Sequence, residues 1–266
     1  MYFDGNITFK GTTSGSLGVI VSSMPKMQHS TVKATEYDIP LRDGIQYSSW
    51  RNRTDAQITV KFAIVKDNNT NYIQTLRATR QWLEGTGELI LDNNPGVYYN
   101  VKKVEITDEE MFTLSSGELE ATFVVEPFEY TVEDIEIDKH VSGEMTVTVT
   151  NDGDLCRPII VTSPYYGASP TVGQWGISVQ IDDNEAAVIT YNTIWETRDL
   201  EVTCDTNKMY TYATNEGVVE AFEEHFTTHN YEDLWIPHGT HDITLNRVEG
   251  STNNAVNIKL RRGFVI

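Results

Sequence analysis

The sequence predicts a mainly β protein of two β-sandwich domains, the first of which carries one packed α-helix. Residues 58–64 and 119–125 alternate apolar with polar side chains, which is the pattern of a strand with one buried face. Residues 71–84 instead repeat apolar side chains with a helical period. In the second half, short alternating segments recur between polar turns, and this spacing is typical of a β-sandwich.

The helix of the first half is expected over Asn71–Glu84. Its apolar side chains form one stripe, which consists of Tyr72, Leu76, Thr79 and Leu83 with Ile73 beside it. A single stripe predicts packing against a sheet. Asn69, Thr70 or Asn71 can cap the first turn, and Gly85 is suited to follow the last. Arg77 and Arg80 lie off the stripe, where they either contact a partner or face solvent.

The second half is expected to hold strands over six short segments: 145–149, 157–161, 177–181, 200–202, 243–245 and 256–260. Turns are expected at Asn151–Asp154 and at Asp182–Asn184, because both stretches are rich in Asp, Asn and Gly. The acidic Asp182–Glu185 stretch lacks the spacing of an EF-hand, so a turn is favoured over a calcium site. A second helix is expected over Gly217–Thr227, with Val218, Phe222 and Phe226 on one face.

A domain boundary is expected near residue 134, which divides the chain into domains 1–134 and 135–266. Pro127 is expected to end the strand before it. The acidic run that follows is not a Gly/Ser linker, so the domains are expected to abut.

The charge of the chain excludes several classes of partner. It carries 39 acidic against 20 basic residues, a formal net charge of −19. Specific nucleic-acid binding requires basic residues that neutralise phosphates, and an anionic membrane surface would repel such a chain. The N-terminal residues show no signal-peptide pattern, and no apolar run is long enough to span a bilayer. We therefore expect folding in a cytoplasm and no membrane insertion.

The chemistry-bearing residues do not form a recognisable catalytic pattern. Cys156 and Cys204 lie in strand-like segments and are expected to be buried free thiols rather than a disulfide. Four histidines lie close together in sequence, namely His225, His229, His238 and His241. They are either exposed around a loop or, less favourably, ligands of a structural metal, and the zincin glutamate is absent.

Paired acids could in principle serve a glycoside hydrolase, and Glu220, Glu223 and Glu224 are the candidates. In so acidic a chain such pairs are expected by chance. We therefore expect no enzyme, no cofactor and no metal.

Aromatic side chains are frequent in the second half: Trp175, Trp195, Trp235, Tyr165, Tyr166, Tyr191 and Tyr212. Aromatic rings either stack on sugars or fill a sandwich core. Core filling is favoured for each ring taken singly, and a carbohydrate-binding protein remains the alternative reading of the chain.

The order of several segments resembles one family. They are Ile39-Pro40-x-Arg42-Asp43-Gly44, the helix ending Trp82-Leu83, Tyr98-Tyr99, Phe123-x-x-x-Glu126-Pro127-x-x-Tyr130, Asn151-x-Gly153, Arg157-Pro158-Ile159-Ile160 and Leu234-Trp235-Ile236-Pro237-His238-Gly239. Together they resemble the distal tail proteins of long-tailed, non-contractile bacteriophages, which form the hub of the tail-tip baseplate. Leu41 replaces a glycine that is frequent in the family, Asp242 stands where many members have Asn, and the helix expected at 217–227 would be an insertion.

The resemblance implies a structural protein of the virion tail tip that is assembled in the host cytoplasm. Its tail-tube-like first domain would form a hexameric ring continuing the tail tube, through which DNA passes without specific binding. Its second domain would be galectin-like or carbohydrate-module-like and would dock receptor-binding or other baseplate proteins. The implied partners are further copies of the chain, the tail tube protein and the tail-associated fibre or lysin protein.

The candidate subunit interface consists of Arg42, Asp43, Trp50 and Arg51, because these residues surround the turn most characteristic of the family.

Overall fold

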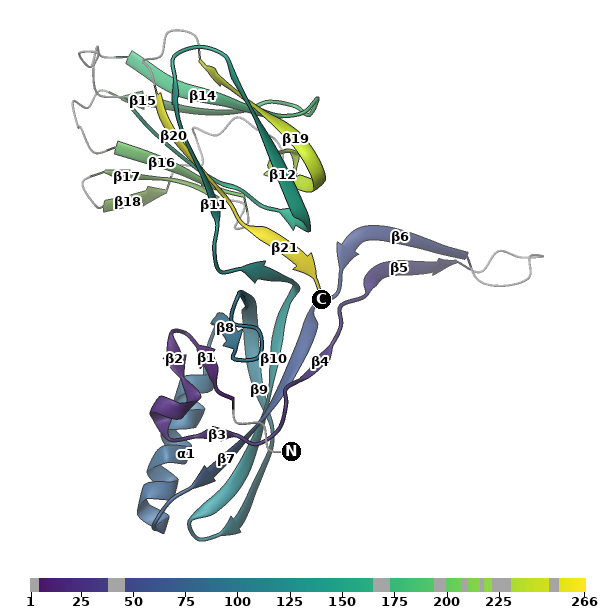
Figure 1. Cartoon of the computed structure of the whole chain (residues 1–266), viewed down its shortest axis with the longest axis vertical. Coiled ribbons are helices and arrows are strands. Elements are labelled where there is room, and N and C mark those ends of the chain that lie inside the picture. Colours follow the sequence, from purple (N-terminus) through teal and green to yellow (C-terminus); the bar gives the residue numbers. More distant parts are fainter. Residues whose placement is uncertain are drawn as a thin grey trace. The chain divides into compact units, whose positions relative to one another are not determined.

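The computed structural model describes residues 5–37, 46–164, 173–193, 200–206, 210–215, 218–221, 231–248 and 254–266. In this part of the chain the fold is mainly β, with antiparallel sheets and one α-helix, as the sequence predicts (Figure 1). The chain separates into two compact units. Unit 1 comprises Met1–Val132 with Val265–Ile266, and unit 2 comprises Glu133–Phe264.

The main sheet of unit 1 is antiparallel and has the strand order β2-β1-β8-β9-β10-β7, with β3 and β4 both paired to β7. Its strands are β1 Ile7–Phe9, β2 Thr12–Thr13, β3 Ile20–Val21, β4 Lys26–Gln28, β7 Ala56–Val65, β8 Gly87–Leu91, β9 Val97–Thr113 and β10 Ser116–Thr131. The short 3₁₀ helix η1, Ser14–Leu17, lies between β2 and β3. Strands β5, Val32–Tyr37, and β6, Gln46–Arg53, form a separate two-stranded sheet.

Helix α1 spans Asn69–Leu83, and its buried side chains confirm the predicted stripe. The Asn68 carboxamide caps the first turn by accepting the Asn71 N–H at 2.9 Å, one residue before the predicted candidates. Gly85 follows the helix with φ +91°, a conformation that favours glycine. One buried residue was not on the predicted stripe, namely Trp82.

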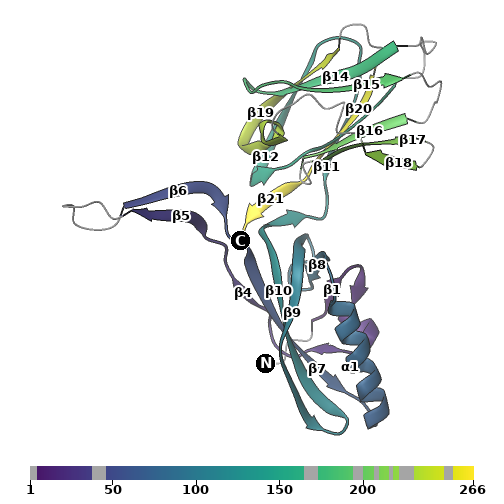
Figure 2. The same ribbon diagram turned by 180° about the vertical axis from the view of Figure 1, so that it is seen from behind.

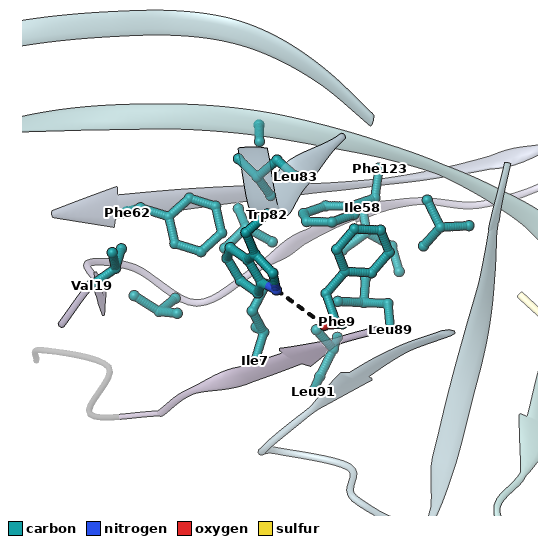
Figure 3. Close-up of a cluster of buried hydrophobic side chains, with 14 of the residues drawn as sticks. Ile7, Phe9, Val19, Ile58, Phe62, Trp82, Leu83, Leu89, Leu91 and Phe123 are labelled. Carbon is teal, nitrogen blue, oxygen red and sulfur yellow. Dashed lines mark hydrogen bonds between the residues drawn. The ribbon is translucent and has the colours of Figure 1, made fainter. Parts of the chain in front are cut away.

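Trp82 organises the core between the helix and the sheet (Figure 3). Its indole meets the rings of Phe9 and Phe62 edge-on, at centroid distances of 6.1 and 5.9 Å. The indole Nε1 donates a hydrogen bond to the Phe9 carbonyl at 3.0 Å, so the buried polar atom is satisfied. The helix therefore covers one face of the sheet. Figures 1 and 2, which view the ribbon from opposite sides, both show α1 beside the sheet of unit 1.

Unit 2 contains two antiparallel sheets. One has the order β15-β14-β19-β12-β21 and the other β11-β20-β13-β16-β17-β18. The strands are β11 Ile135–Val141, β12 Met145–Cys156, β13 Ile159–Pro164, β14 Gly173–Ile181, β15 Ala187–Thr193, β16 Leu200–Asp205, β17 Tyr210–Asn215, β18 Val218–Ala221, β19 Ile236–Arg247, β20 Asn254–Leu260 and β21 Arg262–Val265. Apolar side chains from both sheets form one core, and the 3₁₀ helix η3, Tyr231–Leu234, adds Leu234 to it.

Three local predictions are wrong. Pro127 does not end a strand, because β10 continues to Thr131. The register shifts between Val125 and Glu129, and such an irregularity tolerates a residue without an N–H. Residues 151–154 do not form a turn but lie within β12, where the register against β19 shifts between Asn151 and Leu155.

The helix expected over Gly217–Thr227 is also wrong where the structure describes it. Val218–Ala221 form strand β18, which pairs antiparallel with β17. Cross-strand hydrogen bonds, together with two adjacent β-branched residues, outweigh the helical spacing there. Residues 216–217 and 222–230 lie outside the described residues. The turn predicted at Asp182–Asn184 is confirmed, and the Asn184 N–H donates to the Ile181 carbonyl at 3.0 Å.

Candidate assembly surface

Strand β9 has a free edge over most of its length. β8 pairs with β9 only from Leu89↔Tyr99 to Gly87↔Val101, whereas β10 pairs with β9 as far as Thr113. Residues 102–113 therefore have a strand neighbour on one side only among the described residues, and every side chain from 105 to 113 is exposed. A long unpaired edge is a template for pairing with another chain.

The sheet face opposite α1 is rich in acidic side chains. Thr59 on β7 lies opposite Thr122 on β10, and the two hydroxyls are 3.1 Å apart. By the registers of β7, β10 and β9, the same face carries five acidic residues and two lysines: Glu105, Asp108, Glu110, Glu118, Glu120, Lys61 and Lys103. Two ion pairs offset part of this charge, Lys61–Glu120 at 3.2 Å and Lys103–Glu105 at 2.6 Å. The face keeps an acidic excess.

The ribbon of β5 and β6 pairs with no other described strand. Its base is closed where the Thr54 N–H donates to the Thr31 carbonyl at 2.8 Å and the Thr31 N–H donates to the Thr54 hydroxyl at 2.9 Å. An isolated two-stranded ribbon is marginally stable in water, so it is expected to need packing from elsewhere.

Two of the four predicted interface residues belong to this ribbon. The structure assigns Trp50 and Arg51 to β6 by their backbone alone. Arg42 and Asp43 lie outside the described residues. The interface therefore stays a prediction. The free edge of β9 was missed by sequence reasoning, because the stretch 107–112 shows no alternation that would mark a strand.

The two helix arginines differ in their surroundings. The Arg80 guanidinium donates hydrogen bonds to the carboxylate of Glu109 on β9, at 3.1 Å from Nε and 2.6 Å from Nη2. This hydrogen bonding raises the pKa of Arg80 above its usual value. Arg77 is exposed. Arg80 thus joins the helix to residues 102–113 of β9. Arg77 remains the candidate contact with a partner.

In the described part of the chain, no three or more His, Cys, Asp or Glu side chains come together as they would in a metal site. His238 is exposed, and its Nδ1 lies 3.2 Å from the carbonyl oxygen of Gly153. The prediction that the histidines are exposed around a loop is wrong for His241, which lies within β19 with its Nδ1 2.6 Å from Asp182 Oδ2. The His241 hydrogen bond and the Asp242 backbone N–H lower the pKa of Asp182. His225 and His229 lie outside the described residues.

The cysteines are confirmed as buried free thiols. Burial raises the pKa of Cys156 and of Cys204 to about 12, which keeps both protonated and unreactive near neutral pH. The described residues include no helix that is long and apolar enough to cross a membrane.

Only two of the seven singled-out aromatic side chains are described. The Trp235 ring lies beneath the Arg157 guanidinium at 4.6 Å, and its Nε1 donates to the Thr206 carbonyl at 3.2 Å. Tyr212 stacks on Tyr210, with centroids 5.7 Å apart. Neither belongs to the core of unit 2. The side chains of Trp175 and Tyr191, and the whole of Trp195, Tyr165 and Tyr166, lie outside the description.

The arrangement of strands is shared with solved structures along the whole chain. The Dit protein of phage SPP1, described as a paradigm of the hub adsorption apparatus in phages that infect Gram-positive bacteria, superposes with a TM-score of 0.65 at 11% identity, covering 98% of this chain and 99% of its own. The chain has the fold of a phage tail-hub protein.

Two further structures share this hub fold. Chains of the phage p2 baseplate in its activated conformation, with strontium and with calcium, superpose with TM-scores of 0.60 and 0.59 at 10% identity. Each covers 97% of the present chain, and the chain covers 98% and 97% of them. No family model and no curated relative matches the sequence. The resemblance stated from sequence motifs is therefore confirmed at the level of the fold.

Proposed function

We propose that this protein is the structural hub of a phage tail tip, without catalytic activity. Unit 1 forms a ring of six copies that continues the tail tube, and unit 2 is a galectin-like docking domain for receptor-binding or other baseplate proteins. The hub meets the tail tube protein at one end and the tail-associated fibre or lysin protein at the other. The observation that carries the proposal is the free edge of β9, together with the full-length likeness to hub proteins.

A ring requires two different surfaces on each subunit, because each copy contacts one neighbour on either side. The free edge of β9 supplies one such surface. The β5–β6 ribbon supplies a second surface, since it lacks a strand neighbour among the described residues of its own chain. In the proposed ring, each copy is therefore bound both through β9 and through the ribbon.

The ring is tested by measuring mass in solution with multi-angle light scattering, alongside negative-stain electron microscopy. We expect six-fold rings of six times 30.1 kDa. A monomer at all concentrations, alone and mixed with the tube protein of the same phage, would contradict the proposal.

Two variants test which surfaces build the ring. Replacing residues 32–53 by Asn-Gly joins Thr31 to Thr54, which are already hydrogen-bonded, and removes the ribbon without disturbing the sheet. Ile106→Lys places a charge on the β9 edge, where edge strands commonly use lysine to prevent pairing. Both should yield folded monomers. Ile135→Lys on β11 is the matched control, because the two isoleucines are 42% and 40% exposed.

The acidic face of unit 1 suits the lumen of such a ring. An excess of carboxylates repels phosphates, so DNA would slide through without adhering. We expect Asp108→Lys virions to eject DNA more slowly than wild type. Unchanged ejection kinetics would count against a lumen position for this face.

Carbohydrate binding by unit 2 is the second candidate function. The stacked pair of Tyr210 and Tyr212 favours it, because partly exposed tyrosine rings outside a core can stack on sugars. A glycan array with the whole protein tests this, and binding should be lost in Tyr212→Ala.

A further inference from the structure

The tip of the β9–β10 hairpin carries an apolar patch, and this inference rests on the proposed hub function. Val65, Met111, Phe112 and Leu114, here called the tip patch, lie at the hairpin turn and at the end of β7 beside it. Their exposed fractions are 64%, 50%, 55% and 72%. Val65 adjoins the hairpin turn because it is paired with Ser116, the first residue of β10. A concentration of large exposed apolar side chains marks an interaction site.

The turn that carries the tip patch is held in place by its own polar groups. The Thr113 and Ser116 hydroxyls lie 2.7 Å apart, and the Ser115 N–H donates to the Thr113 hydroxyl at 3.3 Å. The Lys66 N–H donates to the Ser115 carbonyl at 2.9 Å and ties the turn to the end of β7. Because the turn is already ordered, a partner would not have to order it on binding.

Uncompensated negative charge lies directly beside the tip patch. Glu110 of β9 is opposite Glu118 of β10 in the register. Like charges in opposed positions destabilise a strand pair. Neither carboxylate has an ion-pair partner within the described ranges of the chain. A basic group supplied by a partner would relieve this repulsion.

The charge distinguishes between two occupants. A second copy of this chain, with its net charge of −19, would bring further carboxylates against Glu110 and Glu118. A different protein with basic residues around an apolar socket would satisfy both the patch and the acids. In a cyclic ring the tips occupy equivalent positions, so they would form one circle that suits a partner of the same symmetry.

We propose that the tip patch docks into an apolar socket with a basic rim on a different protein, which stacks against the hub as a neighbouring ring. The β9–β10 hairpin then has two functions: its edge joins copies within the ring, and its tip joins the ring to the next component. Phe112 and Leu114 enter the socket, while Glu110 and Glu118 contact its basic rim.

The test measures binding of the whole hub protein to two purified probes, the tail tube protein and the tail-associated fibre or lysin protein of the same phage. Phe112→Ser combined with Leu114→Ser should weaken binding of one probe at least tenfold. The matched control is Met24→Ser combined with Ile135→Ser, which removes apolar side chains of comparable exposure outside the tip patch and should leave binding unchanged.

Charge-reversal variants and a salt series test whether the socket has a basic rim. Glu110→Lys combined with Glu118→Lys should weaken the same probe at least tenfold. Wild-type binding should also weaken as salt rises from about 0.05 to about 0.5 M, because salt screens exposed charges. Charge reversal that leaves binding unchanged would overturn the basic rim.

Two results would overturn the inference as a whole. One is that neither probe binds wild type, or that both bind the Phe112/Leu114 variant as they bind wild type. The other is that the hub protein alone forms pairs of stacked rings and the variant forms single rings of half that mass, which would mean that the tip patch binds a second copy of this chain. If wild type forms no ring but the tip variant still loses probe binding, the ring proposal fails and this inference stands.

Discussion

Strand β9 consists of two parts that differ in strand pairing and in burial. Residues 97–101 lie between β8 and β10, and four of these five side chains are buried. Residues 102–113 have β10 as their one partner strand in the described part of the chain, and their side chains are mostly exposed, including the large apolar Ile106, Met111 and Phe112. The first part contributes to the core of unit 1. The second part is mostly exposed, and we propose that it is the surface that binds partners.

The largest difference should appear between two phenylalanines, one in the core and one at the tip. Phe123 is fully buried and meets Phe9 edge-on at 5.4 Å, so Phe123→Ala should lower the free energy of unfolding by about 3–5 kcal/mol. Phe112→Ala should change it by less than about 0.5 kcal/mol. Urea denaturation followed by tryptophan fluorescence measures both. Similar losses would show that the tip belongs to the core.

A smaller effect is expected where β10 passes close to β9 and α1. A Cβ at Gly117 would collide with the Glu110 carbonyl and the Tyr72 hydroxyl, and the backbone carbonyl cannot easily move. Gly117→Ala should cost about 1–3 kcal/mol of unfolding free energy. Gly143→Ala, where a Cβ meets nothing within 4 Å, is the control and should be nearly neutral. Equal melting temperatures for the two variants would contradict the crowding argument.

The covered part of β9 should also respond to pH. Burial and the hydrogen bond from the Tyr99 hydroxyl to Glu129, 2.9 Å long, raise the pKa of Tyr99 above its usual value. A raised folded-state pKa stabilises the protein fully below about pH 10 and progressively less as pH rises toward the folded pKa.

Tyr99→Phe should therefore cost about 1–2 kcal/mol at pH 7, and the difference from wild type should shrink above about pH 10. Chemical denaturation at pH 7, 9 and 11 measures it. A difference that stays constant across this series would show that Tyr99 ionisation is not linked to folding.

The smallest effect is expected for the ion pair on the distal part of β9. Arg80 and Glu109 are partly exposed, so Arg80→Ala should cost only about 0.2–1 kcal/mol, and less at high salt. Arg77→Ala on the same helix is the control and should be neutral. Denaturation at low and high salt measures both, and a loss of several kcal/mol for Arg80 would mean that the distal part is anchored more firmly than its exposure indicates.

Local patterns predicted the segments that are buried on one side. The segments that alternate over 58–64 and 119–125 form β7 and β10, and the apolar stripe on α1 is buried as predicted. The residue that caps the helix lies one position before the predicted candidates. The predictions failed where one segment could satisfy two patterns. Val218–Ala221 has helical spacing but pairs with β17, and Asn151–Asp154 has turn residues but continues β12 through a register shift.

The candidate surfaces likewise include residues that a sequence motif indicated and residues that no sequence pattern indicated. Arg42, Asp43, Trp50 and Arg51 were chosen from a family-like turn, and the described backbone assigns only Trp50 and Arg51 to the β5–β6 ribbon. The free edge and the tip patch had no signal in the sequence, because residues 102–116 mix acids with apolar residues and follow neither strand nor helix period.

The sequence by itself determined the mainly β class, the helix and the glycine that follows it, the buried thiols and the acidic charge. These features depend on neighbours within a few residues or on composition, where physical preferences act directly. Only the tertiary structure decided that β8 pairs with β9 no further than Val101, that the next twelve residues have one strand neighbour among the described residues, and that Val65 lies beside the hairpin turn. The reason is that strand pairing is chosen between distant segments, and no local period records which edge remains without a partner.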